Sequence, residues 1–328
     1  MNVLAFRAIG TLLVVALAFA PAVQAAPGPQ ASTDARIEQI LAQRDKVQEI
    51  PAVALSHDGR YLAWVVSHHE DARLQVGSPD GKNVRTLTMP DGCRMEDLRW
   101  APHADTLAVL TRCKVDPSNT KPMRGAIWLL DAEDQQTPRK LVELAGFADS
   151  MQWSPDAKRI AFLYVPGATR LPEATASGNP RVGVIGGERM QVQHVAMIAA
   201  SGGTPQVLTP QDLFVYEFRL SPAGDRIAYT AAPPPGDDNW WTAKLYVQQA
   251  SAGATPTVIV DPAGVTGSLH GLQIALPRWS PDATRIFFVG GLMSDRGATG
   301  GDLYNVPASG GAPVNLTPGI KATPSWFT

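Results

Sequence analysis

A short turn motif that recurs along the chain most constrains its fold. Ser-Pro-Asp-Ala or a close variant, flanked by apolar residues on both sides, occurs five times, and a sixth copy begins at Pro324-Ser325-Trp326. The Trp or Leu before each turn is at position 55, 100, 153, 220, 279 or 326, so the intervals are 45, 53, 67, 59 and 47 residues. One four-stranded propeller blade takes about 40 to 50 residues, and the longer intervals leave room for insertions.

The chemistry of each repeat agrees with a hairpin. Proline presets φ for a turn, the Asp side chain accepts a hydrogen bond from the backbone ahead of it, and glycine accepts a positive φ. Two more apolar segments follow in most repeats, joined by a small-residue turn such as Ser201-Gly202-Gly203. The sequence therefore predicts an all-β β-propeller of four-stranded blades, with five repeats plus the start of a sixth in an open or incomplete ring. An ordinary β-sandwich is the alternative.

Composition supports a turn-rich folded protein and excludes one class of partner. The 328 residues include 29 glycines and 28 prolines, a balance that favours many short strands. Lys and Arg number 28 against 30 Asp and Glu, so the net charge is −2. A general nucleic-acid binder carries a basic surface, and we therefore expect no nucleic-acid partner.

The amino-terminal residues predict export. Arg7 precedes an apolar run from Ile9 to Phe19, and small residues follow up to Ala25 and Ala26. This order is typical of a secretory signal peptide. We expect a signal peptide over 1–25, a helical lead-in over 26–50 and the incomplete propeller over 51–328, in a periplasmic or secreted protein. No later stretch approaches the roughly 18 to 20 apolar residues that span a bilayer, so no membrane span is expected after cleavage; an uncleaved anchor is the alternative.

The two cysteines predict one disulfide. Cys93 and Cys113 are equally far from His103, the centre of the second turn, so a hairpin places them opposite each other. An exported protein permits oxidation. A redox-active pair is disfavoured because the spacing is not Cys-x-x-Cys.

The long connections are expected to share one face of the propeller, where recognition is commonly placed. Glu217 precedes the first strand of the fourth repeat and should lie near the central channel, where it could pair with a peptide amino terminus or a neighbouring arginine. Two adjacent tryptophans cannot both enter one core, so Trp240 or Trp241 could line a ligand cleft, pack on a neighbouring domain or begin the third strand. The insertion Pro166–Gln193 is an arm across this face or a surface loop. His270, in a connection between repeats, is expected to be a hydrogen-bonding loop residue rather than a base, and it is a substrate-binding candidate together with Trp240 and Trp241.

Catalytic and metal motifs are missing from the sequence. Gly-x-Ser-x-Gly, the Walker loop, the dinucleotide fingerprint and His-Glu-x-x-His do not occur. In the run His68-His69-Glu70-Asp71, adjacent strand residues point to opposite faces, which favours a solvated loop over a metal site. We expect no catalytic residue, no metal and no cofactor.

The repeat Trp153-Ser154-Pro155-Asp156 through Phe162 resembles the propeller repeat of two exported groups, the Tol-system periplasmic propellers and the prolyl oligopeptidase family of serine peptidases. Three longer features favour the peptidases, including their bacterial dipeptidyl and acylaminoacyl members. They are the lead-in from Arg36 to Val47 before Pro51, the stretches around Val215-Tyr216-Glu217-Phe218 and Asn239-Trp240-Trp241, and His270-Gly271-Leu272-Gln273. The likeness covers residues 36 to 328.

The resemblance implies a substrate-gating and recognition propeller. In that family an α/β-hydrolase domain with Ser, Asp and His follows the propeller, and none of those positions exists in these 328 residues, so no catalytic residue carries over. We therefore expect a chain truncated before its catalytic domain and not hydrolytic by itself, whose partner is a peptide substrate or the missing hydrolase domain. Some members anchor the substrate amino terminus with propeller glutamates, which makes Glu217 and Glu188 candidates. The alternative is a non-enzymatic Tol-type propeller that binds a protein or envelope partner.

Overall fold

The computed structural model describes residues 33–44, 46–68, 71–87, 89, 92–114, 121–133, 138–169, 190–293 and 299–328. The chain divides into two units, 1–47 and 48–328. In the first unit, helix α1 (Thr33–Arg44) lies within the expected helical lead-in and exposes Ile37, Ile40 and Leu41. The expected signal peptide over 1–25 lies outside the described residues.

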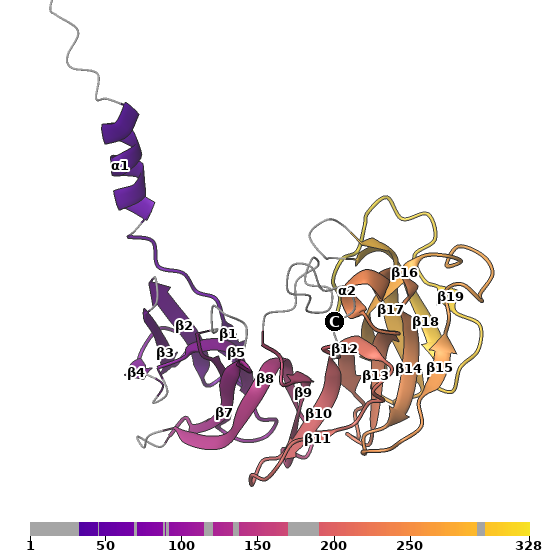
Figure 1. The fold of residues 1–328 in the computed structure, drawn as a ribbon, viewed down its shortest axis with the longest axis horizontal. Helices are drawn as coiled ribbons and strands as arrows, with labels where there is room; N and C mark the ends of the chain where they lie inside the picture. The colour runs from indigo at the N-terminus through magenta and orange to yellow at the C-terminus, as the bar shows by residue number, and fades with distance from the viewer. Residues whose placement is uncertain are drawn as a thin grey trace, which may run out of the picture. The chain divides into compact units, whose positions relative to one another are not determined.

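The second unit contains five blades of four antiparallel strands (Figure 1). Blade 1 contains β1 (Val53–Leu55), β2 (Leu62–His68), β3 (Asp71–Gly77) and β4 (Arg85–Leu87). Blade 2 contains β5 (Arg94–Trp100), β6 (Thr106–Arg112), β7 (Arg124–Asp131) and the first half of β8 (Arg139–Trp153). Blade 3 contains the second half of β8, β9 (Arg159–Pro166), β10 (His194–Ala199) and β11 (Gln206–Val207).

The last two blades follow the same order. Blade 4 contains β12 (Phe214–Leu220), β13 (Arg226–Ala232), β14 (Lys244–Gln249) and β15 (Thr257–Val260), with the short helices α2 (Gly236–Asn239) and η1 (Trp240–Thr242) between β13 and β14. Blade 5 contains β16 (Gln273–Trp279), β17 (Arg285–Met293), β18 (Thr299–Pro307) and β19 (Val314–Asn315). Each repeat therefore forms four neighbouring antiparallel strands, and the chain is the β-propeller that the repeat spacing predicts.

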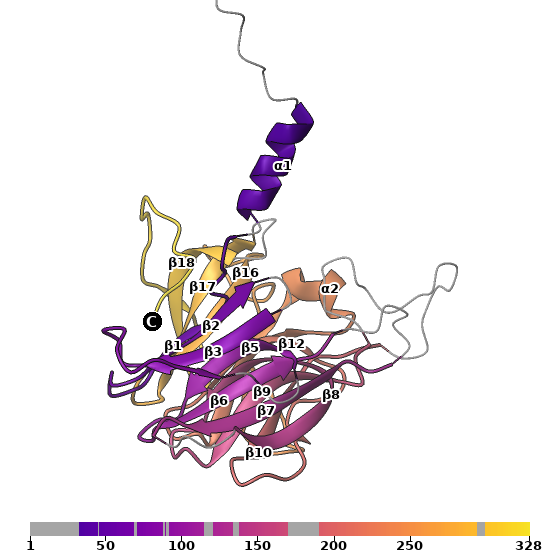
Figure 2. The same ribbon diagram turned by 90° about the vertical axis from the view of Figure 1, so that its left-hand side faces the viewer.

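Blades 2 and 3 share one long strand, which joins them into a seven-stranded sheet. Residues 139–145 of β8 pair with β7, and residues 146–153 pair with β9. The change of partner occurs at Gly146, whose φ is +137° and where a Cβ atom would lie 2.2 Å from the carbonyl oxygen of Val165. Glycine is thus required where the strand leaves one blade and enters the next. Figure 2 brings the sheets that contain β1 to β3 and β5 to β8 toward the viewer.

In blades 1, 3, 4 and 5 the turn of the repeat is held by a serine and an aspartate, whereas in blade 2 Ala101 takes the place of the serine. In blade 3 the Ser154 hydroxyl donates to the Asp156 carboxylate, and the backbone N–H of Arg159 donates to the same hydroxyl at 2.9 Å. The turns of blades 1, 4 and 5 repeat the serine–aspartate bond. The residue three places after the serine adopts a positive φ. Gly224 fills this place in blade 4, but Ala283 fills it in blade 5 with φ +57°.

The hydrophobic core lies between neighbouring blades. One cluster joins blades 1 and 2 through Val65, Leu74, Leu98 and Leu107, and equivalent clusters join blades 2 and 3, 3 and 4, and 4 and 5. Almost every member of these clusters is less than 10% exposed. Each sheet is therefore buried against its neighbours in the sequence, and burial of this apolar area is the main favourable term for the fold.

The tryptophan of the repeat marks a hydrogen bond between blades. The indole N–H of Trp100 donates to the carbonyl of Ala54 at 2.9 Å, that of Trp153 to Arg99 at 2.9 Å, and that of Trp279 to Arg219 at 3.0 Å. We call the Trp or Leu before each turn (55, 100, 153, 220, 279 or 326) the marker position of its repeat. In every case the acceptor is the residue just before the marker position of the preceding blade. The conspicuous sequence period thus corresponds to a repeated contact between the first strands.

The indole bonds predict a selective loss of stability. Trp100→Phe keeps an aromatic ring beside Tyr61 but leaves the Ala54 carbonyl without its donor, so we expect the free energy of unfolding to fall by about 1 to 3 kcal/mol. Trp326→Phe is the control, because Trp326 is 67% exposed, and it should change stability by less than about 0.5 kcal/mol. Urea denaturation measures both. Equal effects of the two substitutions would contradict the assignment.

The turns predict a gain in stability at one alanine. Ala283→Gly relieves a left-handed backbone conformation that costs a side chain about 1 to 2 kcal/mol, and after the added flexibility of the unfolded chain we expect a net gain of about 0.5 to 1 kcal/mol. Ala223, in the turn of blade 4, is outside the set of positive-φ residues, so Ala223→Gly should lose a similar amount. Thermal denaturation of both variants tests the opposite signs.

Candidate functional site

The first strands of blades 2 to 5 each contain a β-bulge a few residues before the marker position. The irregularities lie between Met95 and Asp97, Asp149 and Gln152, Val215 and Glu217, and Ala275 and Arg278. Ser150 and Leu276, within two of the bulges, have positive φ values of 54° and 58°. Bulges turn side chains away from the regular pleat and are frequent beside functional sites.

Two carboxylates connect these bulges across blades. Asp97 in β5 accepts a hydrogen bond from the backbone N–H of Met151 at 2.8 Å, and Glu217 in β12 accepts one from the backbone N–H of Leu276. Each acid therefore accepts a hydrogen bond from a backbone N–H within the bulge of another blade. Between blades 3 and 4 an amide has this role, because Gln152 donates to the carbonyl of Phe218 and accepts from the N–H of Leu220.

Burial controls the charge of both acids. It raises the pKa of Glu217 above its usual value of 4.5, against the opposing effects of the Leu276 N–H and the positive charges of Arg219 and Arg278. It likewise raises the pKa of Asp97, although Arg99 forms an ion pair with Asp97 at 3.0 Å. A buried carboxylate of this kind gains when a cation approaches it.

A pocket of about 360 Å³ opens beside Glu217, and we call it the Glu217 pocket. Its lining comes from both blades 4 and 5 and includes Tyr216, Trp240, Leu276 and Met293. The structure thus brings together two of the residues that the sequence singled out, Glu217 and Trp240. The pocket lies at the end of the blades from which the connection between β13 and β14 leaves.

Contacts with β12 hold the segment that carries Trp240. The Tyr216 hydroxyl donates to the carbonyl of Gly236 at 2.6 Å. Gly236 itself lies against Phe214, since a Cβ atom added to it would be 2.2 Å from the ring. The same strand that carries Glu217 therefore positions the segment that supplies Trp240.

The other predicted site residues lie apart from this pocket or outside the described residues. Trp241 is 58% exposed and, with Trp240, belongs to η1, so the alternative in which the pair begins the third strand is wrong; β14 starts at Lys244. His270 is an exposed loop residue whose Nδ1 lies 2.9 Å from the carbonyl oxygen of Val265. Glu188 and most of Pro166–Gln193 lie outside the described residues.

Three arginines were not identified from the sequence as site residues. Arg99, Arg219 and Arg278 each directly precede the marker position of their repeats. Arg99 and Arg219 line a second cavity of about 780 Å³, together with first-strand residues of blades 1 to 3; we call it the first-strand cavity. Alignment of the five repeats on the marker would have revealed the recurring arginine, but its relation to a cavity needs the three-dimensional structure.

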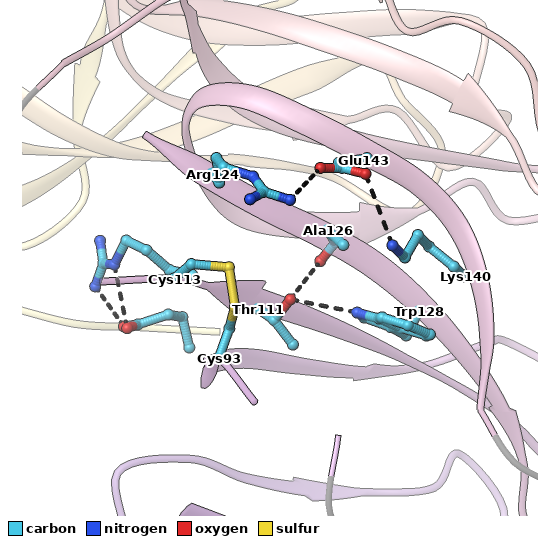
Figure 3. Close-up of a disulfide and its surroundings, with 10 residues drawn as sticks. Cys93, Thr111, Cys113, Arg124, Ala126, Trp128, Lys140 and Glu143 are labelled. Carbon is cyan, nitrogen blue, oxygen red and sulfur yellow. Dashed lines mark hydrogen bonds and ion pairs between the residues drawn. A yellow bond between two sulfur atoms is a disulfide. The ribbon is translucent and has the colours of Figure 1, made fainter. Parts of the chain in front are cut away.

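The structure joins Cys93 and Cys113 by a disulfide next to the open ends of β5 and β6 (Figure 3). Their register depends on a bulge. Near the turn Trp100 pairs with Leu107, whereas beyond the extra residue Glu96 the pairing is Arg94 with Arg112. The bulge shifts the register by one residue and thereby brings the cysteines opposite each other. Thr111, Ala126 and Trp128 lie beside the bridge in Figure 3 and are linked by two hydrogen bonds of 3.3 Å.

Two features are absent from the described residues, a cluster of metal ligands and a membrane-spanning helix. Within the described ranges, no group of three or more His, Cys, Asp or Glu side chains could hold a metal ion. Over the same ranges, no helix has the length and apolar character needed to cross a membrane.

Glu217 predicts a pH-dependent difference in stability. Because burial raises its pKa in the folded protein, its contribution to the free energy of unfolding falls as the pH rises from about 4.5 toward the folded pKa. Glu217→Gln does not titrate and can still accept from Leu276. Urea denaturation at pH 4.5 and pH 7.5 should therefore show the variant gaining stability relative to the unsubstituted protein at the higher pH. A difference that is constant with pH, or that changes in the opposite direction, would refute the assigned burial.

Comparison with known proteins identifies the fold. No family model and no curated protein sequence matches the chain. A structure from a study of two prolyl endopeptidases matches 86% of this chain and 39% of its own chain, with a TM-score of 0.55 and 14% identity. An oligogalacturonate lyase in complex with manganese matches 80% of this chain and 63% of its own, with a TM-score of 0.50 and 10% identity. A candidate TolB from Agrobacterium tumefaciens matches 82% and 80%, with a TM-score of 0.49 and 18% identity. The chain spans less than two thirds of the first two proteins and shares the propeller fold with them.

Proposed function

We propose that this chain is the substrate-recognition and gating propeller of an exported peptidase of the prolyl-oligopeptidase type. The proposal assigns bond cleavage to a hydrolase domain outside these 328 residues and peptide recognition to the propeller. Similarity of fold to the prolyl endopeptidase structure supports it at the level of architecture. The apolar run after Arg7 supports export to the periplasm or the medium.

The Glu217 pocket is the observation that carries the proposal. A peptide amino terminus is an ammonium group with three donors, and a carboxylate in a partly apolar pocket is a suitable acceptor. Glu217 uses one oxygen, Oε2, for Leu276, and the carboxylate has further acceptor positions. Trp240 and Tyr216 add aromatic surface on which the first side chain of a peptide can pack. The geometry thus suits a short peptide with a free amino terminus.

The proposal predicts binding that needs the amino terminus. Calorimetry with a short neutral peptide at pH 7 should give an affinity at least ten-fold higher for the free amino form than for the acetylated form. Glu217→Gln should reduce the affinity for the free form to that of the acetylated one. Glu133→Gln, a change at an exposed acid of blade 2, is the control and should have no effect.

The pH profile adds a second readout. Binding should strengthen as the pH rises from about 4.5, because Glu217 becomes charged, and should weaken above about pH 8, where the peptide amino group loses its proton. Equal affinity for the free and acetylated peptides would overturn the proposal. So would tight binding to a folded envelope protein that Glu217→Gln leaves unchanged, a result that would favour a Tol-type binding module.

A further inference from the structure

Arg99, Arg219 and Arg278 directly precede the marker positions of their repeats, and we call them the marker arginines. They share one hydrogen bond to their own strands. Each guanidinium turns back onto its own strand, where an Nη1 hydrogen bonds to the carbonyl of the preceding residue: Arg99 to Leu98 at 3.2 Å, Arg219 to Phe218 at 3.0 Å and Arg278 to Pro277 at 3.0 Å. These contacts use one donor of five and fix the direction of the side chain. A second hydrogen bond fixes Arg99 further, since its Nε donates to the carbonyl of Met151 at 2.9 Å.

The positive charges of both other arginines act on Arg219. Burial, together with the positive charges of Arg278 and Arg99, lowers the pKa of Arg219 to about 10, and Glu217 opposes this change. Arg99 has Asp97 as an ion-pair partner at 3.0 Å. Arg219 forms no ion pair within the described part of the chain. A half-buried guanidinium without a carboxylate partner is costly unless an anion joins it.

The first-strand cavity provides space for such an anion. It has a volume of about 780 Å³, and both Arg99 and Arg219 line it beside Gln152, Trp100 and Trp153. This volume is within the usual range of ligand pockets, about 300 to 1,000 Å³. Arg99 and Arg219 therefore border open space as well as packed protein.

The shape of the donor group favours one type of anion. Arg219 lies near the charges of Arg99, Arg278 and Glu217, and Asp97 lies near those of Arg99 and Asp149. The planar guanidinium fork matches the two oxygens of a carboxylate.

We propose that Arg99 and Arg219, with Arg278 near Arg219, form a carboxylate-binding site in the first-strand cavity, and that the ligand is a peptide carboxylate. The inference rests on the proposed function for the peptide nature of the ligand. It adds a second recognition point, separate from the Glu217 pocket, which binds either a free carboxyl terminus or an acidic side chain.

Calorimetry with acetylated probes tests the site without involving an amino terminus. The probes are acetyl-trialanine with a free carboxylate, its carboxyl-terminal amide, and an acetylated Ala-Glu-Ala amide. The free-carboxylate probe should bind the unsubstituted protein at least ten-fold more tightly than the amide. The glutamate probe separates the two sources, since a gain for it as well shows that side-chain carboxylates are accepted. Absence of a gain for both probes overturns the inference, as does tighter binding of inorganic phosphate than of acetyl-trialanine.

Variants locate the site. Arg219→Gln should abolish the advantage of the free carboxylate, and Arg73→Gln, at an exposed arginine of β3, should preserve it. If Arg219→Gln does not fold, the comparison of probes on the unsubstituted protein still decides the question. Glu217→Gln should not weaken the binding of acetyl-trialanine. A carboxylate gain without any gain from a free amino terminus would refute the proposed function and leave this site intact, whereas the converse result would refute the site alone.

Discussion

An indole hydrogen bond between first strands is the contact on which the arrangement of the blades depends. A four-stranded sheet can pack against another over a range of angles, and apolar contacts alone choose weakly among them because the hydrophobic effect is non-directional. The bond from Trp100 to Ala54, repeated by Trp153 and Trp279, joins a fixed point on one sheet to a fixed point on another. Blade 4 has Leu220 at the marker, which provides no indole donor, and there Gln152 of blade 3 supplies the hydrogen bonds instead. The direction of the contact changes, but the two strands are still linked.

This linkage also decides which side chains reach the candidate sites. The residues one and three places before each marker lie on the same face of a first strand, so they include Asp97 with Arg99 and Glu217 with Arg219. The bulges in the first strands of blades 3 and 5 provide the N–H groups of Met151 and Leu276, which donate hydrogen bonds to the two acids. The charged residues are therefore held by the framework itself. A rigid set of charges beneath connections of variable length is suited to recognising short ligands.

The sequence predicts the blades well because their signal is local and repeated. Apolar alternation and the Ser-Pro-Asp turn define each hairpin, and hydrogen bonds such as Ser154 to Asp156 are of the kind that the turn chemistry implies. Other features depend on contacts between distant residues. The continuous strand β8 needs the close approach of Val165 to Gly146, and the segment before η1 needs the close approach of Gly236 to Phe214, so neither has a clear pattern in the sequence. The three marker arginines are visible in the repeats, but their meaning depends on burial and on the position of a cavity.

Hydrogen exchange of the tryptophan side chains, followed by nuclear magnetic resonance, tests the central claim most directly. The indole N–H groups of Trp100, Trp153 and Trp279 have backbone carbonyl acceptors in another blade, whereas Trp326 is largely exposed. The account predicts that the first three exchange slowly, in step with the backbone amides of the blades, and that Trp326 exchanges rapidly. Rapid exchange at all four positions would contradict the claim that these bonds join the blades.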